Sequence, residues 1–184
     1  TKVEHIATSE GHDDAVQSLA FSPDGKTLAS GGFRSLLFWD AAKPEKSVRE
    51  IKDPFLGRLT ALLFLPDGKR LLVGDSVPSQ LGRLHEITLT PEKVVTFDNA
   101  HLDSIFSLSL SADGKRYATT SADKLITIRD SANHQILKRL EGHTGYVMAA
   151  AFSPTGDRIA TGGDDEEIKI WNVETAKKVG SFAS

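Results

Sequence analysis

Ser22-Pro23-Asp24-Gly25 is a tight-turn sequence that recurs along this chain at a nearly constant spacing. Its counterparts are Leu65-Pro66-Asp67-Gly68, Ser111-Ala112-Asp113-Gly114 and Ser153-Pro154-Thr155-Gly156. The last glycines of the four turns lie 43, 46 and 42 residues apart. A period of about 40–45 residues is typical of repeat arrays, in which each unit buries its faces against its neighbours. The chain is therefore predicted to consist of four stacked units.

The fourth unit shows most clearly how one repeat is built. Residues 147–152 are apolar and small, as expected for a buried strand, and the Pro–Gly turn leads into a second strand at 158–162. Residues 167–171 alternate, with Ile168 and Ile170 on one face and Lys169 on the other. A fourth strand follows a polar turn, and no helical period lies between the strands.

The same pattern predicts four strands in every unit. First strands are expected near 15–21, 59–64, 104–110 and 147–152, and second strands near 27–31, 70–74, 116–120 and 158–162. Third strands are expected near 35–39, 82–87, 125–129 and 167–171, and fourth strands near 47–51, 93–97, 135–140 and 178–182. Four-stranded antiparallel units at this spacing indicate an all-β fold, with each unit forming one blade of a β-propeller.

Composition narrows the function classes. The 184 residues carry a net charge of −3, so there is no global field to hold nucleic acid or an anionic membrane. No apolar run approaches the about 18 residues of a membrane span, and no Cys is present. No signal peptide is visible, which favours a cytoplasmic location, although the missing initiator Met suggests a processed or excised chain.

Paired motifs at the ends of the repeats resemble those of the WD40 repeat family. Gly142-His143 opens the fourth repeat and Trp171-Asn172 closes it, as Gly11-His12 and Trp39-Asp40 do in the first. The resemblance covers essentially the whole chain, in four copies that keep the same phase. It implies a WD40-type propeller.

The resemblance also implies a hydrogen-bonded tetrad in each well-formed blade. In the fourth repeat its members are His143 before the first strand, Thr161 on the second, Asp165 in the following turn and Trp171 on the third. A half-buried His and a Trp N–H both need partners, so the completed network is expected to make the blade rigid.

The other repeats depart from this set. The first keeps the His, Ser and Trp but has Phe33-Arg34 in a shorter turn where the Asp is expected, and the third has Arg129 in place of the Trp. The second has Phe55 near the His position, Val73 at the Ser position and His85-Glu86 at the Trp-Asp position. We expect this blade to depend on apolar packing by Leu62, Phe64, Leu71, Leu72 and Leu84.

Four blades are too few to close a ring of the kind expected here, because the resemblance implies rings of about seven or eight blades. The expected blades are residues 9–52, 53–98, 99–140 and 141–184, with 1–8 forming the outer strand of a preceding blade. The half ring would expose blade faces and strand edges. We expect a closed ring of eight blades, completed by a second copy as a homodimer or by a missing propeller segment.

No catalytic or metal-binding signature stands out. Three of the six His residues occupy equivalent repeat positions in different blades, and His85 and His134 are expected at the surface. The carboxylates at 164–167 fit a solvated turn better than a calcium site or a glycosidase pair. No nucleophile elbow or phosphate loop is present. We therefore expect no enzyme activity, no cofactor and no metal.

A protein-interaction scaffold is the leading functional hypothesis. In the family, partners dock on the loops before the first strand and between the second and third strands. The candidate residues on that face are Asp13, Phe33, Arg34, Arg58, Leu102, Ser104, Thr144, Tyr146 and Asp164. The alternative is the propeller portion of a larger bacterial enzyme or cytochrome-linked redox protein, whose chemistry lies outside this chain.

Overall fold

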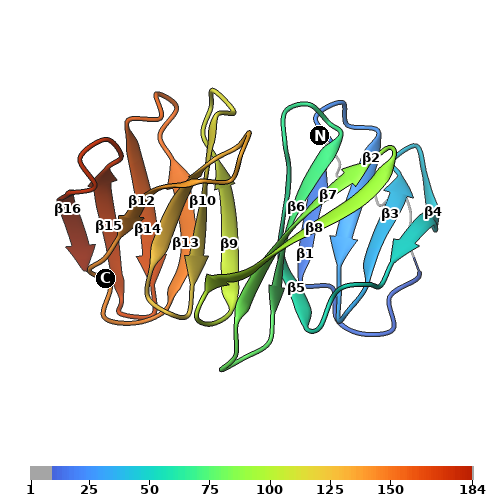
Figure 1. The fold of residues 1–184 in the computed structure, drawn as a ribbon, viewed down its shortest axis with the longest axis horizontal. Helices are drawn as coiled ribbons and strands as arrows, with labels where there is room; N and C mark the ends of the chain where they lie inside the picture. The colour runs from blue at the N-terminus through green and yellow to red at the C-terminus, as the bar shows by residue number, and fades with distance from the viewer. Residues whose placement is uncertain (1–9, 184) are drawn as a thin grey trace, which may run out of the picture.

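The structure, a computed structural model, describes residues 10–183 and contains four four-stranded antiparallel sheets (Figure 1). Blade 1 is β1(Ser18–Phe21), β2(Thr27–Gly31), β3(Leu36–Asp40) and β4(Lys43–Ile51). Blade 2 is β5(Arg58–Phe64), β6(Arg70–Ser76), β7(Gly82–Leu89) and β8(Glu92–His101). Blade 3 is β9(Ile105–Leu110), β10(Arg116–Ser121), β11(Ile126–Asp130) and β12(Ile136–Leu140). Blade 4 is β13(Val147–Phe152), β14(Arg158–Gly163), β15(Glu167–Asn172) and β16(Lys178–Ala183).

These sheets confirm the predicted all-β fold, and each predicted strand overlaps its observed counterpart. Every sheet is ordered along the chain, so each blade is completed by its own fourth strand. The strand that the sequence suggested before residue 9 lies outside the described residues. Among those described, no helix is long and apolar enough to cross a bilayer.

The recurrent turn folds as its residue types require. In the first copy, the Gly25 N–H donates to the Ser22 carbonyl at 2.8 Å, and the Ser22 hydroxyl donates to Asp24 Oδ1 at 2.6 Å. Gly25 has φ 70°, a left-handed conformation that glycine adopts without steric cost. The turn joins the first two strands of the blade and repeats in all four units.

The blades contact one another in chain order through their innermost strands, β1 with β5, β5 with β9 and β9 with β13. One hydrophobic cluster lies between each consecutive pair of blades. The outer strands β4 and β16 lie at opposite ends of the long axis in Figure 1. Among residues 10–183, no further blade packs on the outer face of blade 1 or of blade 4, and Phe21 and Phe182 are 61% and 63% exposed there.

Blade 2 contains the apolar core that its sequence predicted, since all five expected residues are at most 8% exposed. The strand register corrects the predicted alignment, however. Val73 pairs with His85, just as Thr161 pairs with Lys169 two residues before Trp171. The Trp position of blade 2 is therefore held by Ile87, which pairs with Leu71, and not by His85.

Candidate functional site

Blade 4 contains a continuous chain of buried hydrogen bonds. The Trp171 indole N–H donates to Thr161 Oγ1 at 2.8 Å, and that hydroxyl lies 2.8 Å from His143 Nε2. His143 Nδ1 lies 2.8 Å from Asp165 Oδ1. Because the indole is a donor only, the hydroxyl can donate to Nε2, which places the imidazole proton on Nδ1 facing the carboxylate.

Lys169 joins this chain, although the tetrad resemblance did not include it. Its ammonium group is 2.7 Å from Asp165 and 2.9 Å from Glu167, and the residue is only 2% exposed. Burial opposes ionisation of Asp165, but the hydrogen bonds from Lys169 and His143 outweigh it and hold the pKa of Asp165 well below its usual value. Burial lowers the pKa of Lys169, but its two carboxylate partners raise it more. The alternation in the sequence placed Lys169 on the face opposite Ile168 and Ile170, but it gave no signal that the lysine face is the buried one.

Blade 3 keeps the His, Thr and Asp of the set and replaces the Trp contact. His101 lies 2.9 Å from Asp123 and 2.6 Å from Thr119, whose hydroxyl lies 2.6 Å from that of Thr127. Burial alone would raise the pKa of Asp123. The hydrogen bond from His101 and the other donors outweigh burial, so the pKa of Asp123 lies below its usual value. The predicted replacement Arg129 is buried and donates to the Ala100 carbonyl at 3.3 Å.

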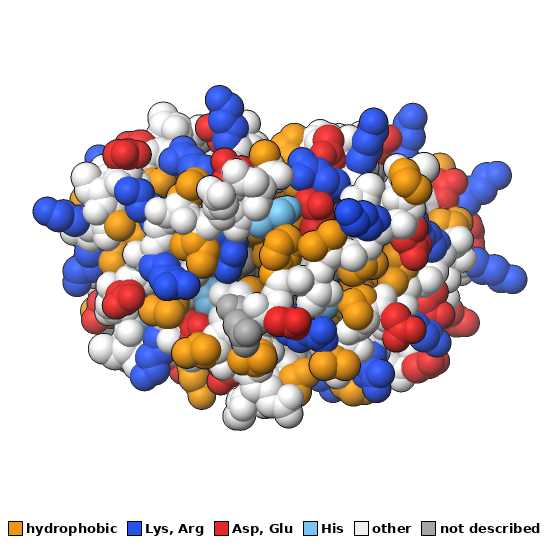
Figure 2. Space-filling view, viewed as in Figure 1, with side chains coloured by type: hydrophobic (Ala, Val, Ile, Leu, Met, Phe, Trp, Pro, Cys, Tyr) orange, Lys and Arg blue, Asp and Glu red, His pale blue; other side chains and the backbone are white. Residues whose placement is uncertain are grey.

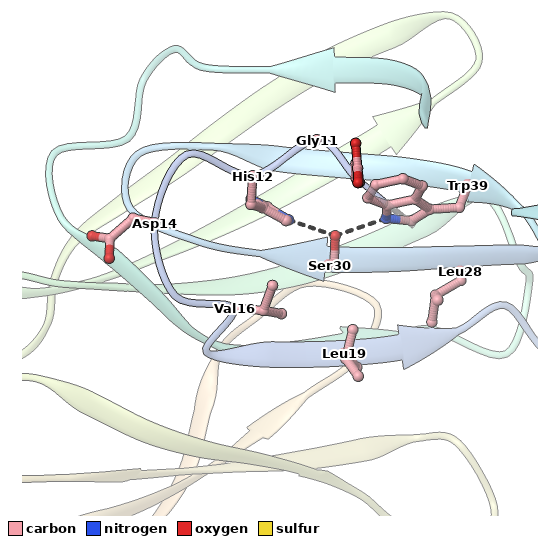
Figure 3. A pocket seen from close by; sticks show the side chains of 9 residues that line it. Gly11, His12, Asp14, Val16, Leu19, Leu28, Ser30 and Trp39 are labelled. Atoms are coloured by element: carbon pink, nitrogen blue, oxygen red, sulfur yellow. Dashed lines mark hydrogen bonds between the residues drawn. The ribbon is translucent and has the colours of Figure 1, made fainter. Parts of the chain in front are cut away.

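Blade 1 has the chain without its carboxylate (Figure 3). Ser30 Oγ lies 2.6 Å from His12 Nε2 and accepts the Trp39 indole N–H at 2.8 Å. Partial burial is the largest influence on His12 and lowers its pKa below 6.5. Val16 and Leu19 line the same pocket, which opens on the uncovered face of blade 1.

In blade 2 a different set of polar residues forms the hydrogen bonds beneath the loop before the first strand. The sequence did not indicate this set. The carboxylate of Asp75 is fully buried and accepts the N–H groups of Leu56 and Gly57 at 2.9 and 2.8 Å. His85 Nε2 lies 3.3 Å from Asp75, and its Nδ1 lies 2.9 Å from Thr96 Oγ1. Burial opposes ionisation of Asp75, but these donors keep its pKa lowered. The expected surface position of His85 is wrong, because the residue is 0% exposed.

His134 is the second histidine that was wrongly expected at the surface. It lies between blades 2 and 3, with Nδ1 2.9 Å from the Tyr117 hydroxyl and Nε2 2.9 Å from Glu86. Arg70 contacts Glu86 at 3.0 Å and also donates to the Ser131 carbonyl of the next blade. Burial raises the pKa of Tyr117. This network joins two blades, and its residues lie outside the tetrad positions.

The buried carboxylates also fix the loops above them. In blade 4 Asp165 accepts the Thr144 N–H at 3.0 Å, and in blade 3 Asp123 accepts the Leu102 N–H at 2.9 Å. Asp75 does the same for Leu56 in blade 2. Each contact holds the backbone of the loop that precedes the first strand of its blade. Those loops are therefore rigid supports for their exposed side chains.

Most of the predicted interaction residues lie exposed at this loop end of the sheets. Phe33 is 50%, Leu102 72% and Tyr146 46% exposed. The guanidinium carbon of Arg58 lies 5.8 Å from the ring centre of Phe33. Its Nη2 atom lies 3.2 Å from the carboxylate of Asp14. Leu56, which follows the buried Phe55 in the loop before β5, is also 55% exposed.

The remaining predicted interaction residues differ in how exposed they are. Asp13, Arg34, Thr144 and Asp164 are exposed, and Arg34 Nε donates to the Phe55 carbonyl of the next blade at 3.2 Å. Ser104 is an exception, because it is 5% exposed and its carbonyl accepts the Ala122 N–H. Ser104 is therefore not available on the docking surface that the sequence suggested.

Comparison with known families agrees with these blades. The family model described as WD domain, G-beta repeat, matches residues 3–40, 91–130 and 134–172. The chain belongs to the WD40 repeat family. The unmatched stretch contains most of blade 2, where Asp75 and His85 replace the family tetrad.

Several curated WD40 relatives align along nearly the whole chain. Protein HIR1 of Cryptococcus neoformans is 28% identical over 94% of this chain, which covers 22% of HIR1. Apoptotic protease-activating factor 1 of Rattus norvegicus is 31% identical over 89% of the chain and is itself covered over 12%. The tRNA (guanine-N(7)-)-methyltransferase non-catalytic subunit wdr4 of Xenopus laevis is 31% identical over 97%, covering 44% of wdr4. The chain thus spans less than half the length of each of these relatives.

Within the described residues, no group of three His, Cys, Asp or Glu side chains is arranged to hold a metal ion. The histidines with carboxylate partners are buried in structural networks. In the face seen in Figure 2, Lys and Arg side chains are interspersed with Asp and Glu, with hydrophobic groups between them.

Proposed function

We propose that this chain is a non-catalytic scaffold that binds partner proteins at the loop end of its blades. One observation carries the proposal: each of the four blades places a large hydrophobic side chain, at least 46% exposed, at this end. These residues are Phe33, Leu56, Leu102 and Tyr146. Exposed aromatic side chains and Arg are frequent energetic anchors of protein interfaces.

The buried carboxylates support this proposal because they reduce the ordering cost of binding. Asp75 and Asp123 each accept the N–H of the residue that carries an anchor, Leu56 and Leu102 respectively. Asp165 accepts the Thr144 N–H, two residues before Tyr146. An anchor on a backbone that is already fixed loses less conformational freedom on binding.

The scaffold is proposed to act within a larger closed ring of eight blades, completed by a second copy or by further blades. A role beside a catalytic partner is the alternative, and it is supported by the relative wdr4, which is named as a non-catalytic subunit of a methyltransferase. In both cases the described residues contribute binding surface, and the chemistry belongs to another protein or domain.

The test compares one loop-face variant with a matched control. Leu102→Ala removes a side chain that is 72% exposed on the loop face, whereas Leu137→Ala removes a 43% exposed side chain from the outer strand β12. Partners that quantitative mass spectrometry finds enriched on the tagged chain are purified, and their Kd is measured. We expect Leu102→Ala to weaken binding at least about tenfold, as for an interface anchor, and Leu137→Ala to leave it unchanged. Equal affinities for wild type and Leu102→Ala, together with a loss for Leu137→Ala, contradict the loop-face proposal.

A further inference from the structure

We propose that blade 1 binds the side-chain carboxylate of an Asp or Glu residue of a partner protein, between His12 and Arg34. The bound group takes the place that a carboxylate of the chain itself occupies in each of the other three blades. The inference rests on the protein-binding function proposed above, and it names the chemistry of one contact at the loop face.

Blades 2, 3 and 4 share one hydrogen bond that blade 1 lacks. In each of them a buried carboxylate accepts the backbone N–H of the residue that follows the His position of the motif. The three donors are Leu56, Leu102 and Thr144. The His position of blade 1 is His12, so the corresponding N–H belongs to Asp13. Within residues 10–183 that N–H donates to no acceptor.

His12 is otherwise placed as its counterpart His143 is placed in blade 4. The ring centres of His12 and Trp39 lie 6.4 Å apart at an interplanar angle of 48°, and those of His143 and Trp171 lie 6.3 Å apart at the same angle. In both blades Nε2 contacts a hydroxyl that also accepts the indole N–H. Blade 1 therefore reproduces the histidine geometry of blade 4 without the carboxylate.

The imidazole proton of His12 is the second donor that lacks an acceptor. Ser30 Oγ accepts the indole N–H, so its own proton can be donated to His12 Nε2, and the imidazole proton is then on Nδ1 (Figure 3). In blade 4 the same atom lies 2.8 Å from Asp165. His12 Nδ1 has no hydrogen-bond partner in the part of the chain that the structure describes.

The turn after the second strand of blade 1 does not supply the missing group. Residues 32–35 include no acidic residue. The turn is also tied to blade 2, because the Arg34 N–H donates to the Gly57 carbonyl at 2.8 Å and the Leu59 N–H donates to the Gly32 carbonyl at 2.9 Å. These hydrogen bonds fix its backbone, so an acceptor for His12 must come from elsewhere.

A pocket of about 420 Å³ opens at this point of the loop face. His12, Phe33 and Arg34 are among the residues that line it. The only hydrogen bond of the exposed Arg34 side chain within residues 10–183 runs from Nε to the Phe55 carbonyl, so both of its Nη groups are available for a carboxylate. Phe33 is 50% exposed and offers an apolar contact to the aliphatic part of an Asp or Glu side chain.

The acidic residues of the pocket are largely engaged with cations. Glu50 lies 3.4 Å from Lys52, and Asp14 lies 3.2 Å from Arg58. Asp13 is exposed and forms no ion pair among the described residues. Its negative charge opposes a ligand carboxylate, so removing that charge while keeping the Asp13 backbone N–H should strengthen binding.

The protonation of His12 gives this site a specific readout. Burial lowers the pKa of His12 below 6.5, although the charges of Glu50 and Asp13 act in the opposite direction. The ligand-free site therefore holds a neutral imidazole at neutral pH. A carboxylate beside Nδ1 favours the imidazolium, so it raises the pKa of His12 and binds more tightly as the pH falls from 8 to 6.

The first test uses acetate as the carboxylate probe and follows the histidine ring signals by NMR. Sodium acetate replaces sodium chloride at constant ionic strength, and the pKa of His12 is measured with and without acetate. We expect saturable shifts of the His12 signals at millimolar acetate and a rise in its pKa of about one unit, which equals a tenfold preference for the imidazolium. His143 is an internal control that should not shift, because Asp165 already contacts its Nδ1.

Three results of this titration overturn the site. They are unchanged His12 signals, equal shifts of His12 and His143, and a ligand-free His12 whose pKa lies above 6.5. In the last case an acceptor that belongs to the chain already holds Nδ1.

Arg34→Gln and Lys124→Gln are a matched pair of variants. Both wild-type residues are exposed cations of positive φ, and each donates to a loop carbonyl of the next blade, that of Phe55 or of Thr144. Only Arg34 lies beside a histidine that lacks a carboxylate. Arg34→Gln should weaken acetate binding at least about fivefold through the lost charge-assisted hydrogen bonds, Lys124→Gln should leave it unchanged, and Asp13→Asn should strengthen it. Equal losses in the two Gln variants overturn the assignment to blade 1.

The same variants, tested with the purified partner, separate this inference from the proposed function. Arg34→Gln should raise the partner Kd at least about fivefold, and saturating acetate should raise it for the wild type but not for Arg34→Gln. Leu102→Ala judges the loop-face scaffold independently. If Leu102→Ala weakens partner binding while Arg34→Gln and acetate do not, the scaffold stands and the partner carboxylate is overturned. Acetate that shifts His12 but leaves the partner Kd unchanged likewise overturns a partner side chain as the source.

Discussion

Blades 4 and 2 solve the same problem with different residues. Each places one buried carboxylate beneath the loop before its first strand, where it accepts backbone N–H groups and contacts a histidine. In blade 4 the carboxylate is Asp165 in the turn after the second strand, and His143 comes from the loop. In blade 2 the carboxylate is Asp75 on the second strand itself, and His85 comes from the third strand.

The difference shows what is preserved when the family motif is lost. In both blades the carboxylate accepts N–H groups of this loop, from Thr144 in blade 4 and from Leu56 and Gly57 in blade 2, whichever strand or turn supplies it. Blade 2 keeps that acceptor and discards the Thr and Trp of the tetrad. The position of a carboxylate under the loop is therefore the shared structural requirement, and the tetrad is one way to meet it.

Replacing Thr161 with Val should have the largest effect, because it breaks the blade 4 chain at its centre. The change keeps the side-chain shape and leaves both His143 Nε2 and the Trp171 N–H without a partner. We expect the free energy of unfolding to fall by about 3 kcal/mol, from two orphaned buried groups at about 1–3 kcal/mol each. Denaturant titration followed by Trp fluorescence measures it.

Thr120→Val is the matched control for that change. Thr120 is equally buried, but its hydroxyl has no hydrogen-bond partner among the described residues. The substitution should be neutral or slightly stabilising, because it removes a polar group that burial leaves unpaired. Equal losses for Thr161→Val and Thr120→Val mean that the chain to His143 and Trp171 contributes nothing beyond packing.

Replacing Asp75 with Asn disrupts the hydrogen bonds beneath the loop of blade 2. The amide offers one acceptor oxygen where the carboxylate offers two, so its NH₂ group faces a backbone donor, either the Gly57 N–H or the Leu56 N–H. A loss of about 2 kcal/mol in unfolding free energy is expected from one unsatisfied buried donor. An unchanged unfolding midpoint argues instead that apolar packing alone holds blade 2, as the sequence first suggested.

Low pH should lower the free energy of unfolding through the buried carboxylates of both blade 2 and blade 4. The pKa values of Asp75 and Asp165 are lowered in the folded chain, so below about pH 4 the unfolded state binds more protons than the folded state. Their contribution to stability is complete above that pH and is lost as the pH falls towards the folded values. Unfolding free energies measured from pH 6 to pH 2 should decline below pH 4. The decline should be shallower in Asp165→Asn, and an equally steep decline refutes the assignment.

The sequence predicted blade 4 well and blade 2 poorly for a physical reason. Turns with fixed chemistry, such as Ser153-Pro154-Thr155-Gly156, keep strand spacing constant, so motif positions can be counted from them. The longer connection at residues 77–81 removes that constraint, and a count from the motif placed His85 two residues away from its true register. His134 was missed because its partners, Tyr117 and Glu86, come from two different blades.

Restoring one motif residue in blade 2 is the most delicate test of the comparison. Val73 stands where the other blades have Ser or Thr, and it is 0% exposed. If the tetrad were intrinsically favourable, Val73→Thr should stabilise the blade. We expect the opposite, a loss of about 1 kcal/mol, because blade 2 has Phe55 and Ile87 where a hydroxyl would need His and Trp. If Val73→Thr instead has a higher unfolding free energy than the wild type with its nearly isosteric Val, His85 can accept a hydrogen bond from the new hydroxyl. The hydrogen-bond arrangements of blades 2 and 4 are then interchangeable.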